Sequence, residues 1–369
     1  MPTYKSKRYL RRVIKNWIIF SICFIVLLSA LLIFIFSPRP YGRLEDKLTV
    51  TELSPSYEIT PFDKGCAYIN RENGELYYID EDGYKLCGYS GATEQTKMRV
   101  SNTRLAVFAS SKLQMVSSSG EYIYSKTYDY PIQDLQISDS ICIMRQIRGA
   151  MDYLVVIDKN GEILDTIVHE HAETILSFGV FTNDDSSIWI ITADVSGITP
   201  IYRFKTYKYD SAKHITVSYS EYNQIIYKPI FKKDKICLLG SHEIIYLDYS
   251  GKVISRTRCV GYEVKKNDYS CNPNVFLLSS VGDLTGSDKK LLCVLNSGIS
   301  YFVEEDYPII SSVVTEKYMY VFTNHYMYRY DLSGFYKVTY PLPEKINNVY
   351  AKNNVCYIVG ESIYRLELN

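Results

Sequence analysis

The clustered histidines of the chain lie in the segment His169-Glu170-His171, with Glu173 two residues further on. Side chains at positions i and i+2 of a strand point to the same side, so His169 and His171 could bind one metal ion with a carboxylate as a further ligand. A solvated polar loop beside a strand has the same composition. The sequence favours the loop, and we name no metal ligand here.

The segment GDLTGSDKK, residues 282–290, resembles a calcium loop because Asp283, Thr285, Ser287 and Asp288 offer hard oxygen ligands around a glycine-bearing turn. A tight calcium loop ends in a further carboxylate, whereas this stretch ends in Lys290 and Leu291. The low number of carboxylates favours a plain surface turn. Whether calcium binds between Asp283 and Asp288 stays open.

The motifs G-x-S-x-G, H-E-x-x-H, G-x-G-x-x-G and the phosphate-binding loop do not occur in the chain. The 41 acidic residues leave room for a pair of catalytic carboxylates, but such pairs converge from distant segments and spacing does not identify them. We therefore name no catalytic, cofactor-binding or metal-binding residue and expect no cofactor.

A membrane anchor is indicated at the N-terminus. Residues 17–36 contain no charged side chain, and a helix of that length spans about 30 Å, the thickness of the hydrocarbon core of a bilayer. Six basic residues and no acidic residue precede it within residues 1–16, which places the tail in the cytoplasm and the chain from about Ser37 outside. A cleaved signal peptide is the alternative, but its apolar region is usually shorter and ends at a small-x-small site.

The charge of the remaining chain argues against nucleic acid as a partner. The 41 basic and 41 acidic residues balance, so removing the six basic residues of the tail leaves 35 basic against 41 acidic. A mildly acidic body offers no basic face for phosphate.

The nine cysteines do not form a metal or disulfide pattern. Cys66, Cys142, Cys237 and Cys356 each stand inside a short apolar run, where cysteine behaves as a small buried hydrophobic residue. We expect buried free thiols, with Cys66–Cys87 and Cys237–Cys259 as the two pairs close enough in one repeat to form exceptions.

Beyond the anchor, short apolar or alternating runs separated by turn residues predict an all-β chain, and the 36 tyrosines fit half-buried strands. A turn ending in glycine recurs at the end of apolar strands, and each is expected to join the third and fourth strands of a four-stranded unit. These turns end at Gly83, Gly120, Gly161, Gly251, Gly298 and Gly334.

A period of about 40 residues with four strands is typical of a β-propeller. First strands are expected to start near Tyr57, Met98, Ile132, Ile175, Ile225, Tyr262, Ile309 and Asn347, which gives about eight blades. Merging two units would give seven. The last unit has three strands, so we expect residues 48–53 to supply its outermost strand, after a short linker over 37–47. The propeller then covers residues 48–369.

The repeats LYYIDEDGYKL and VVIDKNGEIL resemble those of quinoprotein-like (PQQ-like) β-propellers, and the whole arrangement resembles an uncharacterised family of bacterial membrane-anchored propellers. The tryptophan that closes each quinoprotein blade is missing, since Trp189 is the one tryptophan beyond the anchor, and so is the vicinal cysteine pair of many quinoprotein dehydrogenases. The resemblance implies the architecture rather than the cofactor.

Taken together, the sequence favours a non-catalytic interaction scaffold tethered to a bacterial cell membrane by one N-terminal transmembrane helix. Its partner would be an envelope protein, a peptide or a glycan on a propeller face. The alternative is a cell-envelope enzyme, either a polysaccharide hydrolase or lyase or a divergent oxidoreductase. Fold by itself does not decide between them.

The basic tail predicts the orientation of the chain. Protease added to intact cells should digest the chain beyond Ser37 and spare an N-terminal tag, because the tail is expected inside. Immunoblotting with tags at both ends measures the outcome. Protection of the tyrosine-rich body would contradict the predicted topology.

Overall fold

The computed structural model describes a ring of strands and one helix. It covers residues 15–29, 42, 44, 48–51, 53, 56–62, 65–80, 83–87, 89–168, 173–181, 186–209, 214–221, 224–232, 234–263, 268–270, 275–280, 289–295, 300–335, 337–352 and 354–368. The helix occupies residues 15–29 and exposes apolar side chains such as Trp17, Phe20 and Leu27. In this described part of the chain, no helix has both the length and the apolar character needed to cross a membrane.

The strands of the first four blades follow one another along the chain. Blade 1 consists of β2 (Ser56–Phe62), β3 (Gly65–Asn70), β4 (Leu76–Asp80) and β5 (Gly83–Leu86). Blade 2 consists of β6 (Lys97–Val100), β7 (Arg104–Ala109), β8 (Lys112–Ser117) and β9 (Tyr122–Thr127). Blade 3 consists of β10 (Ile132–Ile137), β11 (Ile141–Arg148), β12 (Met151–Asp158) and β13 (Ile163–Val168). Blade 4 consists of β14 (Glu173–Val180), β15 (Ser187–Asp194), β16 (Ile201–Lys208) and β17 (His214–Glu221).

The remaining blades complete the ring. Blade 5 consists of β18 (Ile226–Phe231), β19 (Ile236–Gly240), β20 (Glu243–Leu247) and β21 (Val253–Arg258). Blade 6 consists of β22 (Tyr262–Glu263), β24 (Val275–Ser280), β25 (Lys290–Leu295) and β26 (Ser300–Glu304). Blade 7 consists of β27 (Ile309–Val314), β28 (Tyr318–Thr323), β29 (Tyr326–Asp331) and β30 (Lys337–Pro341), with β23 (Asp268–Ser270) added beside β27. Blade 8 consists of β31 (Asn348–Lys352), β32 (Val355–Val359), β33 (Ile363–Glu367) and β1 (Leu48–Val50).

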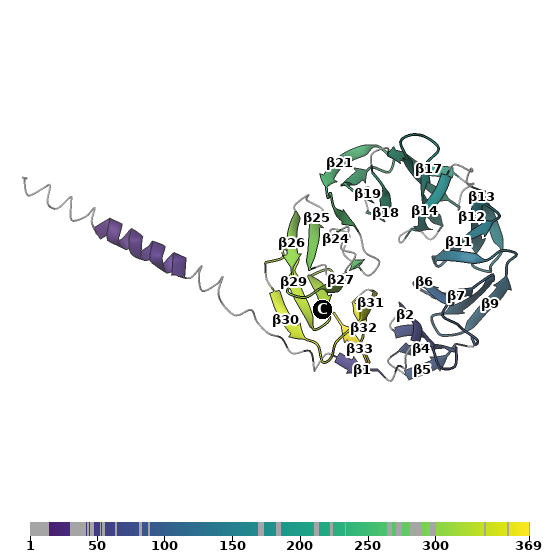
Figure 1. Ribbon diagram of the computed structural model, residues 1–369, viewed down its shortest axis with the longest axis horizontal. Coiled ribbons are helices and arrows are strands. Elements are labelled where there is room, and N and C mark those ends of the chain that lie inside the picture. The colour runs from purple at the N-terminus through teal and green to yellow at the C-terminus, as the bar shows by residue number, and fades with distance from the viewer. Residues whose placement is uncertain are drawn as a thin grey trace, which may run out of the picture.

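The described strands thus form eight sheets arranged as a β-propeller (Figure 1). The first strand of each meander lies toward the centre of the ring and the last lies at its rim. The expected first-strand starts agree with the observed ones to within two residues, from Ser56 in blade 1 to Asn348 in blade 8. The short parallel strand β23 was not expected, because it pairs with β27 across an intervening segment.

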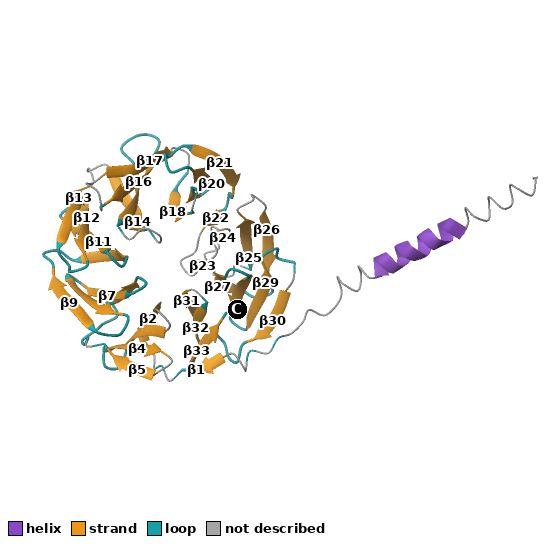
Figure 2. Cartoon of the chain, turned by 180° about the vertical axis from the view of Figure 1, so that it is seen from behind, coloured by secondary structure: helices purple, strands orange, loops and turns teal. Residues whose placement is uncertain are grey.

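The ring is closed by the N-terminal strand, as expected from the three-stranded last unit. Strand β1 pairs antiparallel with β33 in the register Leu48 with Leu366 and Val50 with Tyr364. The amide of Thr51 continues the pairing by donating to the carbonyl of Ile363 at 2.9 Å. Figures 1 and 2 both show β1 at the outer edge of blade 8. The closing strand satisfies a backbone edge that would otherwise be open.

Two residues of the predicted linker over residues 37–47 lie in the described part of the chain, and both contact the propeller. The amide of Gly42 donates to the carbonyl of Thr339 at 2.9 Å. Leu44 is 3% exposed and packs in the apolar cluster between blades 7 and 8. The chain is therefore held against the propeller before β1 begins.

Apolar side chains fill the space between neighbouring blades rather than one central core. The second and third strands of a blade are largely buried, as in β7 and β8, whereas the rim strand β9 has only exposed and half-buried positions. The described residues form eight apolar clusters, one for each adjacent pair of blades, including blades 8 and 1. The eight described cysteines are free, and the seven in the propeller are buried, as expected for small core residues.

The glycine turns lie where the repeat predicts them. Gly120, Gly161, Gly251 and Gly334 adopt positive φ between the third and fourth strands of their blades. Gly83 begins the fourth strand of blade 1, and Gly298 lies outside the described residues. In the blade 3 turn, the Asp158 carboxylate accepts from the amides of Asn160 and Glu162, each at 2.8 Å.

The glycine turns at Gly161, Gly251 and Gly334 also touch the rim strand of the preceding blade. At Gly161, with φ of 83°, an added Cβ would lie 2.7 Å from the ring of Tyr124 on β9. The Tyr128 hydroxyl and the Lys126 ammonium both donate to the Gly161 carbonyl, at 3.2 and 3.0 Å. The turn therefore needs a glycine for its backbone conformation and for the close approach of the neighbouring blade.

Gly161→Ala should destabilise the protein more than Gly149→Ala does. Both glycines have positive φ, but nothing lies within 4 Å of a Cβ added at Gly149. We expect about 1–2 kcal/mol for the backbone term at each position and a further loss at Gly161 from the clash with Tyr124. Thermal unfolding of the full chain in detergent measures both. Equal melting temperatures for the two variants would contradict the inter-blade role of this turn.

Deleting residues 48–53 should lower the melting temperature of the full chain sharply. The deletion exposes the edge of β33 and removes Leu53, which packs between blades 8 and 1. A deletion of equal length within the basic tail is the control and should leave the melting temperature unchanged. Equal effects of the two deletions would disprove closure by β1.

Candidate functional site

The histidine cluster suggested by the sequence is only partly within the described residues. His169, Glu170 and His171 lie outside them. Glu173 is described, and its carboxylate accepts a hydrogen bond from the Arg203 guanidinium, which also pairs with Asp194 at 3.0 Å. Glu173 is thus engaged in an ion pair within blade 4.

The calcium-like segment also falls outside the described residues at Asp283, Thr285, Ser287 and Asp288. Lys290, which follows it, pairs with Glu304 at 3.2 Å. In the described part of the chain, no group of three histidine, cysteine or acidic side chains is placed to hold a metal ion.

A polar cleft of about 410 Å³ lies between blades 4 and 5. It is built at the end of β17, at the β19–β20 hairpin and at the end of β21, so it belongs to the face that carries the second-to-third hairpins and the connections between blades. We call this the connection face. The residues lining the cleft are Glu221, Gln224, His242, Glu243, Arg256, Arg258 and Val260.

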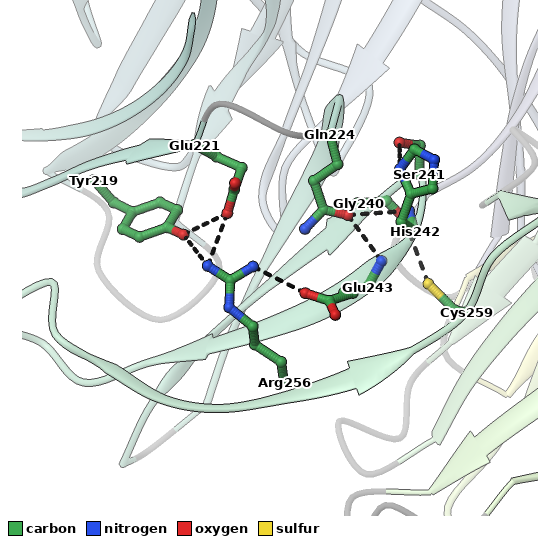
Figure 3. Close-up of polar contacts among 9 residues, drawn as sticks. All are labelled: Tyr219, Glu221, Gln224, Gly240, Ser241, His242, Glu243, Arg256 and Cys259. Atoms are coloured by element: carbon green, nitrogen blue, oxygen red, sulfur yellow. Dashed lines mark hydrogen bonds and ion pairs between the residues drawn. The ribbon is translucent and has the colours of Figure 1, made fainter.

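Arg256, on the rim strand β21, holds the two carboxylates of the cleft (Figure 3). Its Nη1 donates to Glu243 Oε2 at 2.9 Å, and its Nη2 donates to Glu221 Oε2 at 2.9 Å. The Tyr219 hydroxyl, 2.9 Å from Nη2, donates to the same Glu221 oxygen at 2.6 Å. The Glu221 side chain is 5% exposed, so the guanidinium compensates a nearly buried charge.

Gln224 is held by the backbone of the β19–β20 hairpin. Its Oε1 accepts from the amide of His242 at 3.0 Å and from the amide of Glu243 at 2.8 Å. A Cβ added at Gly240 would lie 2.3 Å from this oxygen, so glycine makes room for the side chain. Gln224 is 4% exposed, and its Nε2 has no hydrogen-bond partner among the residues that the structure describes.

The hairpin beside Gln224 is fixed by two further contacts. Ser241 Oγ and His242 Nδ1 lie 2.8 Å apart. The amide of Cys259 donates to the carbonyl of His242 at 2.7 Å, which joins the end of β21 to the hairpin. Burial raises the pKa of the Cys259 thiol to about 11, so this cysteine stays protonated at neutral pH.

Arg256 and Tyr219 both have raised pKa values. Burial lowers the pKa of the Arg256 guanidinium, but hydrogen bonds to Glu243 and Glu221 outweigh it and the pKa is raised above its ordinary value. Burial, followed by the hydrogen bond to Glu221, raises the pKa of the Tyr219 hydroxyl. Neither of these two groups exchanges a proton near neutral pH.

The same positions in blade 7 hold an aromatic pair instead of a cleft. Gln224 stands two residues before Ile226 and Tyr307 two residues before Ile309, and both isoleucines precede a bulge in the first strand. His325 occupies the place of His242 in the second-to-third hairpin, and its ring meets that of Tyr307 edge-on at 5.4 Å.

No pattern in the sequence predicted the cleft. Its residues come from three strands and two connections, and no local spacing links Glu221 with Glu243 and Arg256. One signal was present: Arg256 and Arg258 stand at i and i+2 of a rim strand, where both side chains point to one side.

The comparisons with known proteins identify the fold. The chain matches no protein-family model, and no curated protein matches it in sequence. The structure of Saccharomyces cerevisiae Sqt1 is similar with a TM-score of 0.56 at 7% identity, covering 87% of this chain and 98% of that chain. A eukaryotic initiation factor gives 0.51 at 10% identity, covering 85% and 81%. The Pan2 WD40 domain of Neurospora crassa gives 0.49 at 10% identity, covering 90% and 98%.

Replacing Arg256 with methionine should destabilise the protein because the nearly buried Glu221 then loses its ion pair with the guanidinium. A double-mutant cycle with Glu221→Gln should give a coupling of about 1–3 kcal/mol, with the double variant more stable than Arg256→Met alone. The melting temperatures of the full chain in detergent measure this. The control is Lys290→Met, whose partner Glu304 is 63% exposed and whose pair should contribute less than about 1 kcal/mol. Additive effects at Arg256 and Glu221 would contradict the compensation described here.

Proposed function

We propose that the protein is a membrane-tethered scaffold whose propeller binds an envelope protein, peptide or glycan on the outer side of a bacterial cell membrane. The N-terminal segment anchors the chain, and the connection face of the propeller carries the partner. The cleft held by Arg256 is the observation that carries this proposal.

The cleft suits recognition because its polar groups are fixed before any partner arrives. Arg256 is held by two carboxylates and a hydroxyl, and the Gln224 amide by two backbone N–H groups. Donors and acceptors that do not need to reorient lose little conformational entropy on binding. A site of this kind discriminates partners by hydrogen-bond geometry.

Aromatic side chains on the same face support a role in binding. In blade 3, Tyr130 is 40% exposed and the Arg148 guanidinium lies 4.7 Å from its ring centroid. In blade 7, Tyr307 is 38% exposed and packs against His325 and Tyr326. Tyrosine and arginine are enriched in protein interfaces because they combine apolar contact with a polar end.

The membrane tether rests on the N-terminal sequence. Six basic residues precede an uncharged stretch over residues 17–36, and part of that stretch is helical with exposed apolar side chains. This order supports an anchor with a cytoplasmic tail. The likeness of the repeats to those of quinoprotein-like bacterial propellers is part of the same proposal.

The alternative of an envelope enzyme finds no support in this cleft. Glu221 and Glu243 both bind the guanidinium of Arg256, which lies between them. Hydrolysis of a glycosidic bond requires one of two carboxyls to be protonated and to face the other across the substrate.

Site-directed photo-cross-linking in the producing cells tests the proposal. A photoreactive residue at Tyr307, on the connection face, should capture a partner, whereas one at Ser119, in an exposed glycine turn on the opposite face, should not. The full chain is used, and its presence in the membrane fraction is checked in the same samples. Equal capture from both faces, or none from Tyr307, would disprove binding through the connection face.

A further inference from the structure

We infer that the cleft between blades 4 and 5 binds an acidic peptide segment, with a peptide carbonyl on the Gln224 amide and a side-chain carboxylate on Arg258. This inference rests on the proposed scaffold function and names the partner chemistry of one site on its face.

The Gln224 side chain carries a buried hydrogen-bond donor that faces the cleft and has no acceptor among the described residues. The side-chain oxygen of Gln224 accepts from two backbone amides, so the amide cannot be turned over without losing both bonds. The Nε2 group is therefore fixed on the side of the cleft. Gln224 as a whole is 4% exposed, and Nε2 has no hydrogen-bond partner among the described residues. A buried donor of this kind is normally satisfied, and a carbonyl oxygen is its natural acceptor.

The two arginines of the cleft differ in their ion pairs. Arg256 is already bound to Glu221 and Glu243, whereas Arg258 is exposed and makes no ion pair with any residue that the structure describes. Both arginines stand on β21 two residues apart, so their side chains leave the same face of the strand. Arg258 thus gives the cleft a positive charge that no described residue neutralises.

A peptide fits these groups better than a bare anion. Two carboxylates line the cleft, and they repel an anion that has no donors of its own. A peptide brings N–H groups for Glu221 and Glu243, a carbonyl for Gln224, and an aspartate or glutamate for Arg258. Val260, 47% exposed at the edge of the cleft, offers apolar contact to a neighbouring side chain. The volume of about 410 Å³ suits a few residues.

The equivalent positions of blade 7 hold an aromatic pair. There Tyr307 and His325 occupy the positions of Gln224 and His242, and their rings pack together at 5.4 Å. An exposed lysine away from the cleft, Lys112 on β8, serves as the control for removal of a positive charge.

The test uses the purified full chain in detergent and an array of capped random decapeptides. Bound peptides should be enriched in aspartate and glutamate, and the best peptide is then measured by fluorescence anisotropy. Gln224→Glu keeps an acceptor for the two backbone amides and removes the donor, so affinity should fall at least tenfold. Arg258→Gln should remove the preference for a glutamate peptide over its glutamine analogue. Lys112→Gln should change neither value.

Three outcomes would overturn the inference: no peptide binding on the array, unchanged affinity in Gln224→Glu, or Arg258-dependent binding of uronic-acid oligosaccharides in place of peptides. The photo-cross-linking at Tyr307 separates this failure from that of the proposed function. Capture of a partner that is equal in wild type and Gln224→Glu would leave the scaffold proposal standing and remove the cleft from it.

Discussion

Every blade of this protein depends on neighbours, because its sheet is apolar on both faces. Second strands such as β7 and β19 are buried along their length, which a single sheet in water cannot achieve. The apolar clusters accordingly lie between blades, and the cluster of Leu53, Ile59 and Tyr357 joins the last blade to the first. Burial is therefore complete only in a closed ring, and the pairing of β1 with β33 is what closes it.

The rim of the ring is held by contacts that the tyrosine content makes available. The Tyr128 hydroxyl reaches the carbonyl of Gly161 in the next blade, and the Tyr301 hydroxyl reaches the carbonyl of Leu332 at 2.8 Å. On the first-to-second turns, Asp139 of blade 3 accepts from the amide and hydroxyl of Thr103 in blade 2, at 2.9 and 2.8 Å. Burial of apolar side chains between blades stabilises the closed ring. These polar contacts fix the position of one blade against the next.

The local sequence pattern predicted most strands and turns of the fold, but it did not predict the cleft. Strand starts, glycine turns and the closing strand follow from alternation, turn chemistry and the need to cover an open edge, which all act over a few residues. Strand β23 and the contacts of Gly42 and Leu44 escaped prediction because their partners lie far along the chain. The cleft escaped for the same reason, since Glu221, Glu243 and Arg256 meet only after blades 4 and 5 have packed.

The repeat also explains why a binding site can differ from blade to blade without loss of the fold. Gln224 and Tyr307 lie outside the apolar clusters between blades, so these two positions can vary while the buried strands cannot. Gln224 and Tyr307 occupy equivalent positions, yet one orders a polar hairpin and the other packs against His325. In blade 5 this variation combines with Gly240, whose missing side chain admits the Gln224 amide, and with the two arginines of β21. The cleft is therefore a departure from the repeat on a scaffold that the repeat itself keeps rigid.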